Sequence, residues 1–591
     1  MRTRIAILKQ DRCHPGRCSK ECYRYCPMVR TGDETISFDE KSGKAIISEI
    51  LCEGCGICVK RCPFNAIMII GLPEELEGME THRYGPNGFV LYGLPIPREG
   101  RVTGLLGQNG IGKSTVVKIL SGDIRPNLGR GEEVVWDEIL KRYAGSELLD
   151  YFKRLRDGEI RSAAKPQYVD QIPKVFQGTV GMLLERTDEK GLMNEYVSIL
   201  GIDELLDREI ETLSGGELQR VAITACISRD VDIYFLDELT PYLDIHQRIN
   251  VTNLIQQLAE DSTVFVVEHD LAILDSMAEV IHIAYGVPAA YGVITPLKGV
   301  RVGINEYLRG HLVKENIRIR GKPIRFEIHL PREDLGGSPY IKYSGFGVKY
   351  DGFTLDADGG TLFEGEVMGI VGENSIGKST FVKVLAGVIE PSNGNPGIDI
   401  KISYKPQYIK ADEDISAGEL LASLTDDFNT GHYRSEILKP LQLEDILDSS
   451  ILSLSGGELQ RTAIAATLSR EADLYIFDEP SAHLDVEQRM LATKVIRRFV
   501  ENKGLCAMVV DHDIYMIDLL ADRLLVFDGE PGRWGKAMGP FSMREGMNRF
   551  LERIKTTFRR DEGGRPRINK LDSKLDREQK MKGEYYYVRD G

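Results

Sequence analysis

The stretch Gly107-Gln108-Asn109-Gly110-Ile111-Gly112-Lys113-Ser114 decides the fold of the chain around it. It follows a short apolar run at residues 102–106 and opens a predicted helix, which is the strand, loop and helix context of a P-loop. Its glycines let backbone N–H groups close around phosphates, Lys113 can reach the outer phosphates, and Ser114 can ligate magnesium. The sequence therefore predicts a nucleotide-binding α/β domain.

An internal repeat extends this pattern through most of the chain. A second P-loop, Gly372-Glu373-Asn374-Ser375-Ile376-Gly377-Lys378-Ser379, follows the apolar run 367–371, and further motifs recur in the same order at offsets of roughly 240 to 265 residues. The first copy continues with Pro166-Gln167, Leu213-Ser214-Gly215-Gly216-Glu217-Leu218-Gln219-Arg220, Tyr234-Phe235-Leu236-Asp237-Glu238 and Val267-Glu268-His269-Asp270. The second continues with Pro406-Gln407, Leu454-Ser455-Gly456-Gly457-Glu458-Leu459-Gln460-Arg461, Tyr475-Ile476-Phe477-Asp478-Glu479 and Val510-Asp511-His512-Asp513. The chain is duplicated.

Two acidic pairs end apolar runs that are typical of buried parallel strands. Asp237 and Asp478 would hold magnesium, and Glu238 and Glu479 would orient and deprotonate the attacking water for in-line phosphoryl transfer. Ligands of α/β sheets bind at the carboxyl ends of the strands, where these pairs lie. His269 and His512 follow further apolar strands; either alone would be an ordinary surface histidine, but their matched place in the repeat favours a role in catalysis.

The doubled octapeptide that begins Leu-Ser-Gly-Gly-Glu resembles the signature motif of ABC ATPases, which separates this family from other P-loop proteins. The resemblance implies that two nucleotide domains face head to tail, so that Ser214 completes the ATP site of Lys378 and Ser455 that of Lys113. It also implies that Gln167 and Gln407 sense the γ-phosphate.

The same resemblance implies the remaining site residues. The nucleotide contacts would be Asn109, Gly110, Gly112, Lys113, Ser114, Thr115, Asn374, Gly377, Lys378, Ser379, Thr380, Gly215, Gly216, Gly456 and Gly457, with the D-loop acids Asp244 and Asp485. The magnesium ligands would be Ser114, Gln167 and Asp237 in one site, and Ser379, Gln407 and Asp478 in the other. Tyr84 and Phe89 are candidates for stacking on adenine, although aromatic residues ahead of a strand are as often core.

Eight of the ten cysteines lie within the first 62 residues, which indicates a local function. They form two rows, Cys13-x4-Cys18-x3-Cys22-x3-Cys26-Pro27 and Cys52-x2-Cys55-x2-Cys58-x3-Cys62-Pro63, and the second matches the bacterial ferredoxin run. In that run the fourth cysteine ligates the other cluster. We therefore assign one 4Fe-4S cluster to Cys52, Cys55, Cys58 and Cys26, and another to Cys13, Cys18, Cys22 and Cys62. Structural zinc and disulfides are the alternatives, and Cys226 and Cys506 fit buried structural thiols.

The two halves differ in three places. From P-loop lysine to glutamine the first half has 54 residues and the second 29, so an insertion of about two dozen residues lies near 132–160, where apolar residues repeat at helical spacing. We expect a helix-loop-helix there. Leu239 follows Glu238 where the family usually has proline, and Ser375 stands where a loop glycine is usual, so the repeat does not establish that the two sites are equivalent.

The composition places limits on function. A hydrophobic fraction of 42% is typical of a globular protein, no apolar run is long enough to cross a bilayer, and no export signal follows Met1. The chain is therefore expected neither to span a membrane nor to be exported, and the family resemblance given below implies a cytoplasmic location. The net charge of −15 argues against a general nucleic-acid binder, but a basic stretch at 549–582 could contact a polyanion or form a solvated tail.

Two ferredoxin-type clusters joined to two ABC domains resemble the ribosome-recycling ATPases of ABC subfamily E, also called the RNase L inhibitor family. Further matching stretches are His82-Arg-Tyr-Gly-Pro86, Lys165-Pro-Gln-Tyr-Val-Asp170, Gly303-Ile-Asn-Glu-Tyr-Leu-Arg309 and Glu315-Asn-Ile-Arg-Ile-Arg320. The resemblance implies a multidomain α/β and α+β protein with a ferredoxin-like domain at 1–75, ABC domains at 76–300 and 341–530, a hinge at 301–340 and a bracing region at 531–591.

That family splits ribosomes into subunits, together with a release factor or Pelota. The resemblance implies the same role here, with contacts to the small subunit and ribosomal RNA, ATP and magnesium as cofactors, and a monomer whose ATPase domains pair within one chain. An ATP-gated redox or iron-sulfur transfer enzyme is the alternative, and a transporter engine is a third reading that leaves the clusters unexplained.

Overall fold

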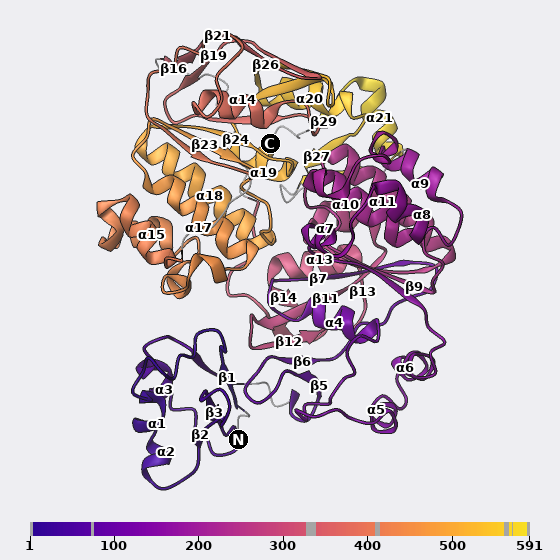
Figure 1. The fold of residues 1–591 in the computed structure, drawn as a ribbon, viewed down its shortest axis with the longest axis vertical. Helices are drawn as coiled ribbons and strands as arrows, with labels where there is room; N and C mark the ends of the chain where they lie inside the picture. Colours follow the sequence, from indigo (N-terminus) through magenta and orange to yellow (C-terminus); the bar gives the residue numbers. More distant parts are fainter. Residues whose placement is uncertain are drawn as a thin grey trace.

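The computed structural model describes residues 4–71, 76–326, 339–407, 414–560, 566–569, 571 and 573–587. The chain forms one small N-terminal body and two larger halves of related architecture (Figure 1). No helix among the described residues is long and apolar enough to cross a membrane.

The N-terminal body carries the cysteine rows. Strand β1 (Arg4–Leu8) pairs antiparallel with β4 (Ile67–Gly71), β2 (Ile36–Phe38) pairs with β3 (Ala45–Ile47), and three short helices lie between them, α1 (Glu21–Arg24), α2 (Pro27–Arg30) and α3 (Ile57–Arg61). The body is tied to the first half through the buried Asn87, whose Nδ2 donates to the carbonyl oxygens of Ala6 and Ile47, each 2.8 Å away.

The first half is a nine-stranded sheet in the order β5-β6-β12-β11-β7-β10-β9-β8, with β13 beside β11. Its parallel centre places the P-loop strand β7 between β10 and β11, and all residues of β7, β9 and β10 are buried, as their apolar runs predict. The strands are β5 (Glu80–Arg83), β6 (Val90–Tyr92), β7 (Val102–Gly107), β8 (Ser162–Lys165), β9 (Ile233–Asp237), β10 (Thr263–Val267), β11 (Val280–Val287), β12 (Tyr291–Ile294) and β13 (Lys298–Gly299). The helices are α4 (Lys113–Leu120), α7 (Ile172–Val175), α8 (Val180–Thr187), α9 (Met193–Leu200), α10 (Gly215–Ile227), α11 (Ile245–Asp261), α12 (Leu271–Met277) and α13 (Val300–Arg309).

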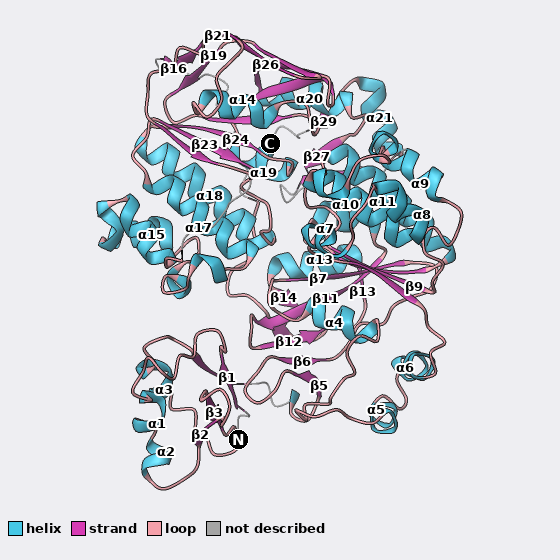
Figure 2. Cartoon of the chain, viewed as in Figure 1, coloured by secondary structure: helices cyan, strands magenta, loops and turns pink. Residues whose placement is uncertain are grey.

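The second half repeats this plan in the order β21-β17-β18-β26-β25-β20-β24-β23-β22. Strand β20 takes the place of β7, and helices cover both faces of the sheet (Figure 2). The strands are β17 (Phe346–Tyr350), β18 (Phe353–Ala357), β20 (Val367–Val371), β21 (Asn393–Gly394), β22 (Ile402–Lys405), β23 (Leu474–Asp478), β24 (Cys506–Val510), β25 (Arg523–Glu530) and β26 (Trp534–Ser542), with the separate pair β16 (Pro339–Tyr343) and β19 (Gly360–Phe363). The helices are α14 (Lys378–Leu385), α15 (Ala417–Leu424), α16 (Gly431–Tyr433), α17 (Gly456–Ser469), α18 (Val486–Lys503), α19 (Ile514–Leu520) and α20 (Met543–Arg553).

The inserted segment forms two helices, α5 (Trp136–Arg142) and α6 (Leu148–Arg156). Their apolar side chains pack on the core of the first half: Ile139 and Phe152 are fully buried there, and Phe152 contacts the rings of Trp136 and Tyr143. The charged faces of both helices point to solvent because only one stripe of each is apolar.

Two further segments join the halves. After α13 the chain forms the short pair β14 (His311–Leu312) and β15 (Ile317–Arg318); of the hinge expected at 301–340, residues 327–338 lie outside the described residues. The C-terminal sheet of β27 (Phe558–Arg560), β28 (Pro566–Ile568) and β29 (Tyr586–Tyr587), with α21 (Lys574–Lys582), contacts the first half through Arg567, which pairs with Asp275 at 3.1 Å. Residues 561–565, 570, 572 and 588–591 of that region also lie outside the described residues.

Candidate functional site

Each P-loop closes on its own lysine. Gly112 and Gly377 precede α4 and α14 with φ of 88° and 101°, a left-handed conformation that glycine adopts without strain. Lys113 Nζ donates to the carbonyl oxygens of Gly107 at 3.1 Å and Gln108 at 2.7 Å, and Lys378 makes the equivalent bonds in the second half. Both ammonium groups are buried at a helix N-terminus, which is the arrangement that suits a phosphate group.

In the first half the acidic pair lies at the carboxyl end of β9, beside its predicted partners. Glu238 Oε1 accepts a hydrogen bond from Gln167 Nε2 at 2.7 Å and lies 3.7 Å from His269 Nε2. Burial, followed by the charge of Glu238, raises the pKa of Asp237 to about 7. A buried carboxylate of this kind is stabilised by a cation, so Asp237 fits a magnesium ligand.

The second half repeats the geometry more tightly. Gln407 Nε2 donates to Glu479 Oε1 at 2.6 Å, and His512 Nε2 lies only 3.0 Å from the same oxygen. Asp478 Oδ1 is buried and has no hydrogen-bond partner. Burial raises the pKa of Asp478 to about 6, and this unpartnered oxygen again fits a metal ligand.

The two halves meet head to tail, as expected. Asn374 of the second P-loop donates its backbone N–H to Asp244 Oδ2 at 2.9 Å and its Nδ2 to the carbonyl oxygen of Tyr242 at 2.9 Å. In the mirrored contact Asn109 donates its backbone N–H to Asp485 Oδ2 at 3.4 Å. A methyl group on the signature residue Gly216 would lie 3.5 Å from Asn374 Nδ2, so each signature faces the opposite P-loop.

These contacts define two composite sites. The first site would contain Lys113, Glu238 and the opposite Ser455, and the second site Lys378, Glu479 and the opposite Ser214. Each signature serine caps a helix, α17 or α10, in a capping box with the glutamate three residues on. The positive end of each signature helix is therefore held at the opposite P-loop.

The remaining predicted residues lie around the P-loops. Tyr84 is exposed and its hydroxyl lies 3.2 Å from Thr115 Oγ1, so its ring borders the first site. Phe89 is half-buried, and a methyl group on Gly112 would come within 2.6 Å of its ring. The Phe89 ring therefore packs against the P-loop. Ser375 adopts φ of 56°, the left-handed conformation that Gly110 adopts at the equivalent position. The Ser379 side chain acts to lower the pKa of Asp478, against the effect of burial, and Ser114, Thr380, Gly215 and Gly456 lie on the same loops and helix ends.

Sequence reasoning missed a buried lysine behind each acidic pair. Lys165 Nζ donates to the carbonyl oxygens of Asp237 at 2.9 Å and Glu238 at 2.8 Å, and Lys405 makes the same contacts behind Asp478 and Glu479. Burial lowers the pKa of each lysine to about 8. The repeated Lys-Pro-Gln tripeptide was the signal that could have found them. They fix the backbone turn in which Glu238 and Glu479 adopt positive φ, 49° and 50°.

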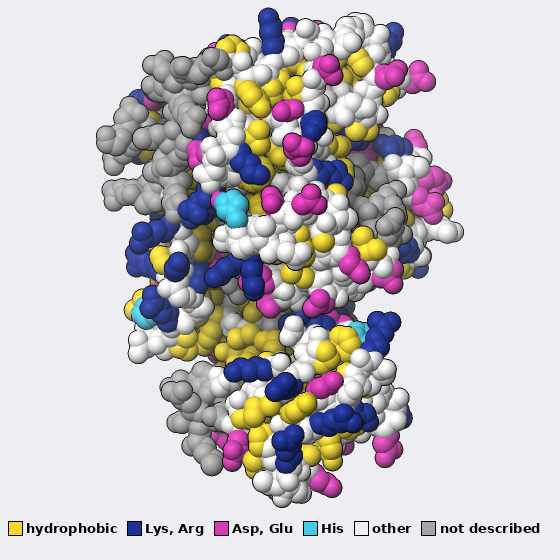
Figure 3. Space-filling view, turned by 90° about the vertical axis from the view of Figure 1, so that its left-hand side faces the viewer, with side chains coloured by type: hydrophobic (Ala, Val, Ile, Leu, Met, Phe, Trp, Pro, Cys, Tyr) yellow, Lys and Arg dark blue, Asp and Glu magenta, His cyan; other side chains and the backbone are white. Residues whose placement is uncertain are grey.

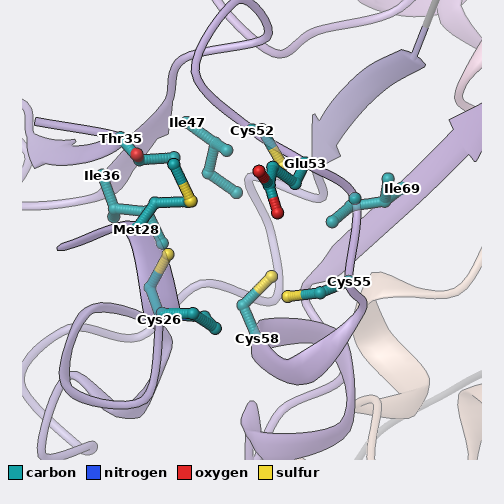
Figure 4. A pocket seen from close by; sticks show the side chains of 12 residues that line it. Cys26, Met28, Thr35, Ile36, Ile47, Cys52, Glu53, Cys55, Cys58 and Ile69 are labelled. Atoms are coloured by element: carbon teal, nitrogen blue, oxygen red, sulfur yellow. The ribbon is translucent and has the colours of Figure 1, made fainter. Parts of the chain in front are cut away.

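The cysteines gather in the two predicted sets. Cys26, Cys52, Cys55 and Cys58 line one cavity, with their sulfur atoms around its centre (Figure 4). Burial, and then the neighbouring thiols of this set, raise the pKa of Cys58 to about 12. Cys22 shows the same effect, to about 11, from burial and from Cys62, Cys18 and Cys13.

The arrangement of the first set of thiols favours a cluster over a single zinc ion. All ten cysteines are free thiols in this structure. Among the described residues no three His, Cys, Asp or Glu side chains converge on a point that would hold a single metal ion, and four thiols around a cavity fit a larger group such as a cubane.

The fold and the site together define an ABC-type ATPase with an N-terminal iron-sulfur domain. The sequence matches the family "ABC transporter" over residues 97–241 and 355–482, "Possible Fer4-like domain in RNase L inhibitor, RLI" over 3–34 and "4Fe-4S binding domain" over 45–68. These matches support ATP and iron-sulfur clusters as its cofactors.

Comparison with full-length relatives identifies the subfamily to which the chain belongs. It is 44% identical to "Translation initiation factor RLI1" of Saccharomyces cerevisiae over 99% of this chain and 98% of the relative, and 54% identical to an uncharacterized ABC transporter ATP-binding protein of Methanocaldococcus jannaschii over 99% and 98%. The structure described as "Model of ribosome-bound archaeal Pelota and ABCE1" superposes with a TM-score of 0.94 at 50% identity, covering 99% of both chains. A complex of the archaeal ribosomal stalk protein aP1 with the archaeal ribosome recycling factor aABCE1 gives 0.81 at 51% identity, covering 87% of this chain and 100% of that one. The chain belongs to subfamily E of the ABC ATPases, the RNase L inhibitor family.

Proposed function

We propose that this protein is an ATP-driven ribosome recycling factor, which splits ribosomes into subunits after termination or stalling. The observation that carries the proposal is similarity over the full length of the chain to the ABCE1 protein of a ribosome-bound Pelota and ABCE1 assembly. Because all three parts match together, the ferredoxin-like domain and both ATPase halves are retained in the arrangement of that protein.

The residues of each composite site divide the chemistry of hydrolysis. Glu238 or Glu479 takes the proton of the attacking water, held in place by the adjacent glutamine and histidine. The P-loop lysine and the opposite signature serine hold the nucleotide phosphates. Magnesium, when bound to Asp237 or Asp478 with the P-loop serine and the glutamine, supplies charge stabilisation for the departing phosphates.

The eight N-terminal cysteines would hold two 4Fe-4S clusters, one in each set of four. Bound clusters would cross-link a body whose own sheets have only two strands each, so their role in this proposal is structural. A redox or cluster-transfer enzyme is not favoured, because the family relationship accounts for the same residues.

The N-terminal body is placed to respond when the halves move. It is fixed to the first half by Asn87 and by an ion pair of 3.0 Å between Glu49 and Arg83. Its Lys9 also lies near the second half: burial and Arg12 lower the pKa of Lys9, and the carboxylates of Asp445 and Glu458 act against that shift. Since Glu458 belongs to the capping box of the second signature helix, closure of the first site changes the surroundings of this body.

The surface of the N-terminal body suits a polyanion despite the acidic chain. Figure 3 shows Lys and Arg side chains beside apolar ones on its exposed face. Tyr25 is exposed, with the guanidinium groups of Arg61 and Arg30 4.7 and 5.5 Å from its ring centre. Stacked arginine and aromatic groups are typical of contacts with RNA backbones and bases, so this face supports the proposed contact with ribosomal RNA.

The test is sedimentation of intact ribosomes with the cluster-loaded protein, a release factor or Pelota, and ATP. We expect the unmodified protein to convert ribosomes into subunits, and the Glu238→Gln and Glu479→Gln double variant to stay bound to one subunit, because it closes on ATP but does not hydrolyse it. Failure of both proteins to associate with ribosomes under any nucleotide would reject the proposal, and ATP-dependent electron transfer would then be measured.

A further inference from the structure

The carboxylate of Glu487 connects the two halves of the protein at the first site. Glu487 stands at the start of α18 in the second half, and its Oε2 accepts two hydrogen bonds from the first half. Gln108 of the first P-loop donates from Nε2 at 2.7 Å, and Arg320 donates from Nε at 2.9 Å. The side chains of Glu487 and Arg320 are 23% and 10% exposed, so the pair is largely shielded from water.

Arg320 is held firmly to the first half. Its Nη1 donates to the carbonyl oxygen of Tyr307 at 2.9 Å, and its guanidinium group stacks on the Tyr307 ring at 4.9 Å. Tyr307 is buried in the core of that half. A methyl group on Gly310 would approach Arg320 Cβ within 2.9 Å, so glycine is required for this close approach. The bond from Arg320 to Glu487 is therefore a contact between two rigid bodies.

The second site also has an arginine and a carboxylate beside its P-loop, but they are differently placed. Helices α13 and α20 are equivalent, each following the antiparallel strands of its sheet, with Gly303 and Gly546 packed on the neighbouring strand. Arg553, at the end of α20, pairs directly with Glu373 of the second P-loop at 2.7 Å and also contacts Asp528. Here arginine, carboxylate and P-loop all belong to the second half.

The residue equivalent to Glu487 in the first half is His246, since each is the second residue after a D-loop aspartate, Asp485 or Asp244. His246 is exposed, and among the described residues no hydrogen bond or ion pair is recorded for it. The carboxylate thus lies across the interface at the first site and within one half at the second.

We propose that Glu487 is a positioning residue that holds the first site closed through Gln108 and Arg320, whereas the second site is held across the interface by the hydrogen bonds of Asn374 to Asp244 and Tyr242. This inference rests on the composite sites proposed above. Opening of the first site breaks two hydrogen bonds to one carboxylate, whereas opening of the second leaves the Arg553 and Glu373 pair intact. Removal of the Glu487 carboxylate should therefore speed nucleotide release at the first site and leave the second site unchanged.

The test measures retention of ATP by the full cluster-loaded chain, with hydrolysis blocked by Glu238→Gln and Glu479→Gln. Ser214→Arg confines closure to the first site, and Ser455→Arg confines it to the second. In the Ser214→Arg background we expect Glu487→Ala to shorten the retention half-time about fivefold, the loss typical of a partly exposed charged hydrogen bond. In the Ser455→Arg background the same change leaves retention unaltered.

Two controls separate this role from a general loss of structure. His246→Ala, the matched position, should leave retention unchanged in both backgrounds. Glu487→Gln keeps the size of the side chain and an oxygen that can accept from Gln108 and Arg320, so it should shorten retention at the first site less than Glu487→Ala does.

The outcomes are distinguishable. An equal effect of Glu487→Ala in both backgrounds, or none in either, overturns the inference while leaving the composite sites in place. If Ser214→Arg and Ser455→Arg each leave two retained nucleotides per chain, the assignment of the composite sites fails, and this inference falls with it.

Discussion

Asn374 and Asp244 lie 130 residues apart, yet the backbone N–H of Asn374 is 2.9 Å from Asp244 Oδ2. The other oxygen of Asp244 accepts a hydrogen bond from the Gln247 N–H at 2.9 Å and caps α11. One carboxylate therefore begins a helix in the first half and fixes the P-loop of the second. Its two oxygens allow the two effects to be separated by mutation.

Replacing Asp244 with serine should retain the helix cap but lose the contact with Asn374, because the serine side chain is too short to reach both groups. We expect a melting temperature close to that of the unmodified protein and faster loss of ATP from the second site. Asp244→Ala should lose the cap as well, at about 1 kcal/mol. Thermal unfolding and nucleotide retention measure the two effects; equal retention in both variants and the unmodified chain would contradict the cross-interface role.

Replacing the two proposed catalytic glutamates with glutamine should block hydrolysis without blocking ATP binding. Glu238→Gln and Glu479→Gln keep the size of the side chain but remove the proton acceptor, so hydrolysis should fall by about a hundredfold or more when both are changed, with ATP binding retained. Phosphate release and equilibrium binding are the measurements. Residual hydrolysis at the unmodified rate would assign the base elsewhere.

The grouping of the thiols predicts which of the two proposed clusters is lost when a single cysteine is replaced with serine. Cys62 belongs with Cys13, Cys18 and Cys22, so Cys62→Ser should disturb that set and leave the set of Cys58 in place. Iron content should fall from about eight atoms per chain to about four, and Cys58→Ser should remove the other half. Cys226→Ser and Cys506→Ser serve as controls with unchanged iron, since both thiols are buried in the ATPase halves. Loss of all iron in every N-terminal variant would indicate that the two sets fold as one unit.

A buried histidine in the first half makes its stability dependent on pH. His282 Nδ1 lies 2.7 Å from the Thr295 carbonyl oxygen, and Nε2 accepts from the Ile96 N–H at 3.2 Å. Burial lowers the pKa of His282. The unfolded chain therefore binds a proton as the pH falls below about 6.5 while the folded chain does not, and stability present above that pH is lost as the pH decreases toward the folded pKa.

Melting temperatures across about pH 5 to 8 test this prediction. His282→Gln should flatten the acidic fall, and His311→Gln, at an exposed position, should leave it unchanged. An identical slope in the His282 variant would assign the pH dependence to other groups.

Local sequence predicted the parts of the protein that repeat. The P-loops, acidic pairs, signature helices and both cysteine sets follow from residue types at fixed spacing, and the inserted residues form two helices as their apolar period indicates. The hinge and domain boundaries remain predictions, as do the roles given to individual site residues.

What could not be predicted are contacts that depend on how the halves are placed. Gln108 and Glu487 are separated by 379 residues, and neither stands in a motif that specifies its partner. Tyr242 and His483, from the two D-loops, are hydrogen-bonded at 3.1 Å for the same reason. Lys165 was visible in the sequence as part of a matching stretch, but its role behind the acidic pair depends on backbone carbonyls that only the fold brings together.

The duplication within one chain has a consequence for how such interfaces can diverge. In a dimer of identical subunits a twofold axis presents the same residue at both interfaces, so any substitution is made twice. Here Glu487 and His246 occupy related positions, and each is encoded separately. Joining the halves also replaces a concentration-dependent encounter with an intramolecular one. Covalent fusion therefore allows each interface to acquire contacts of its own, so that two similar parts can be tuned separately within one chain.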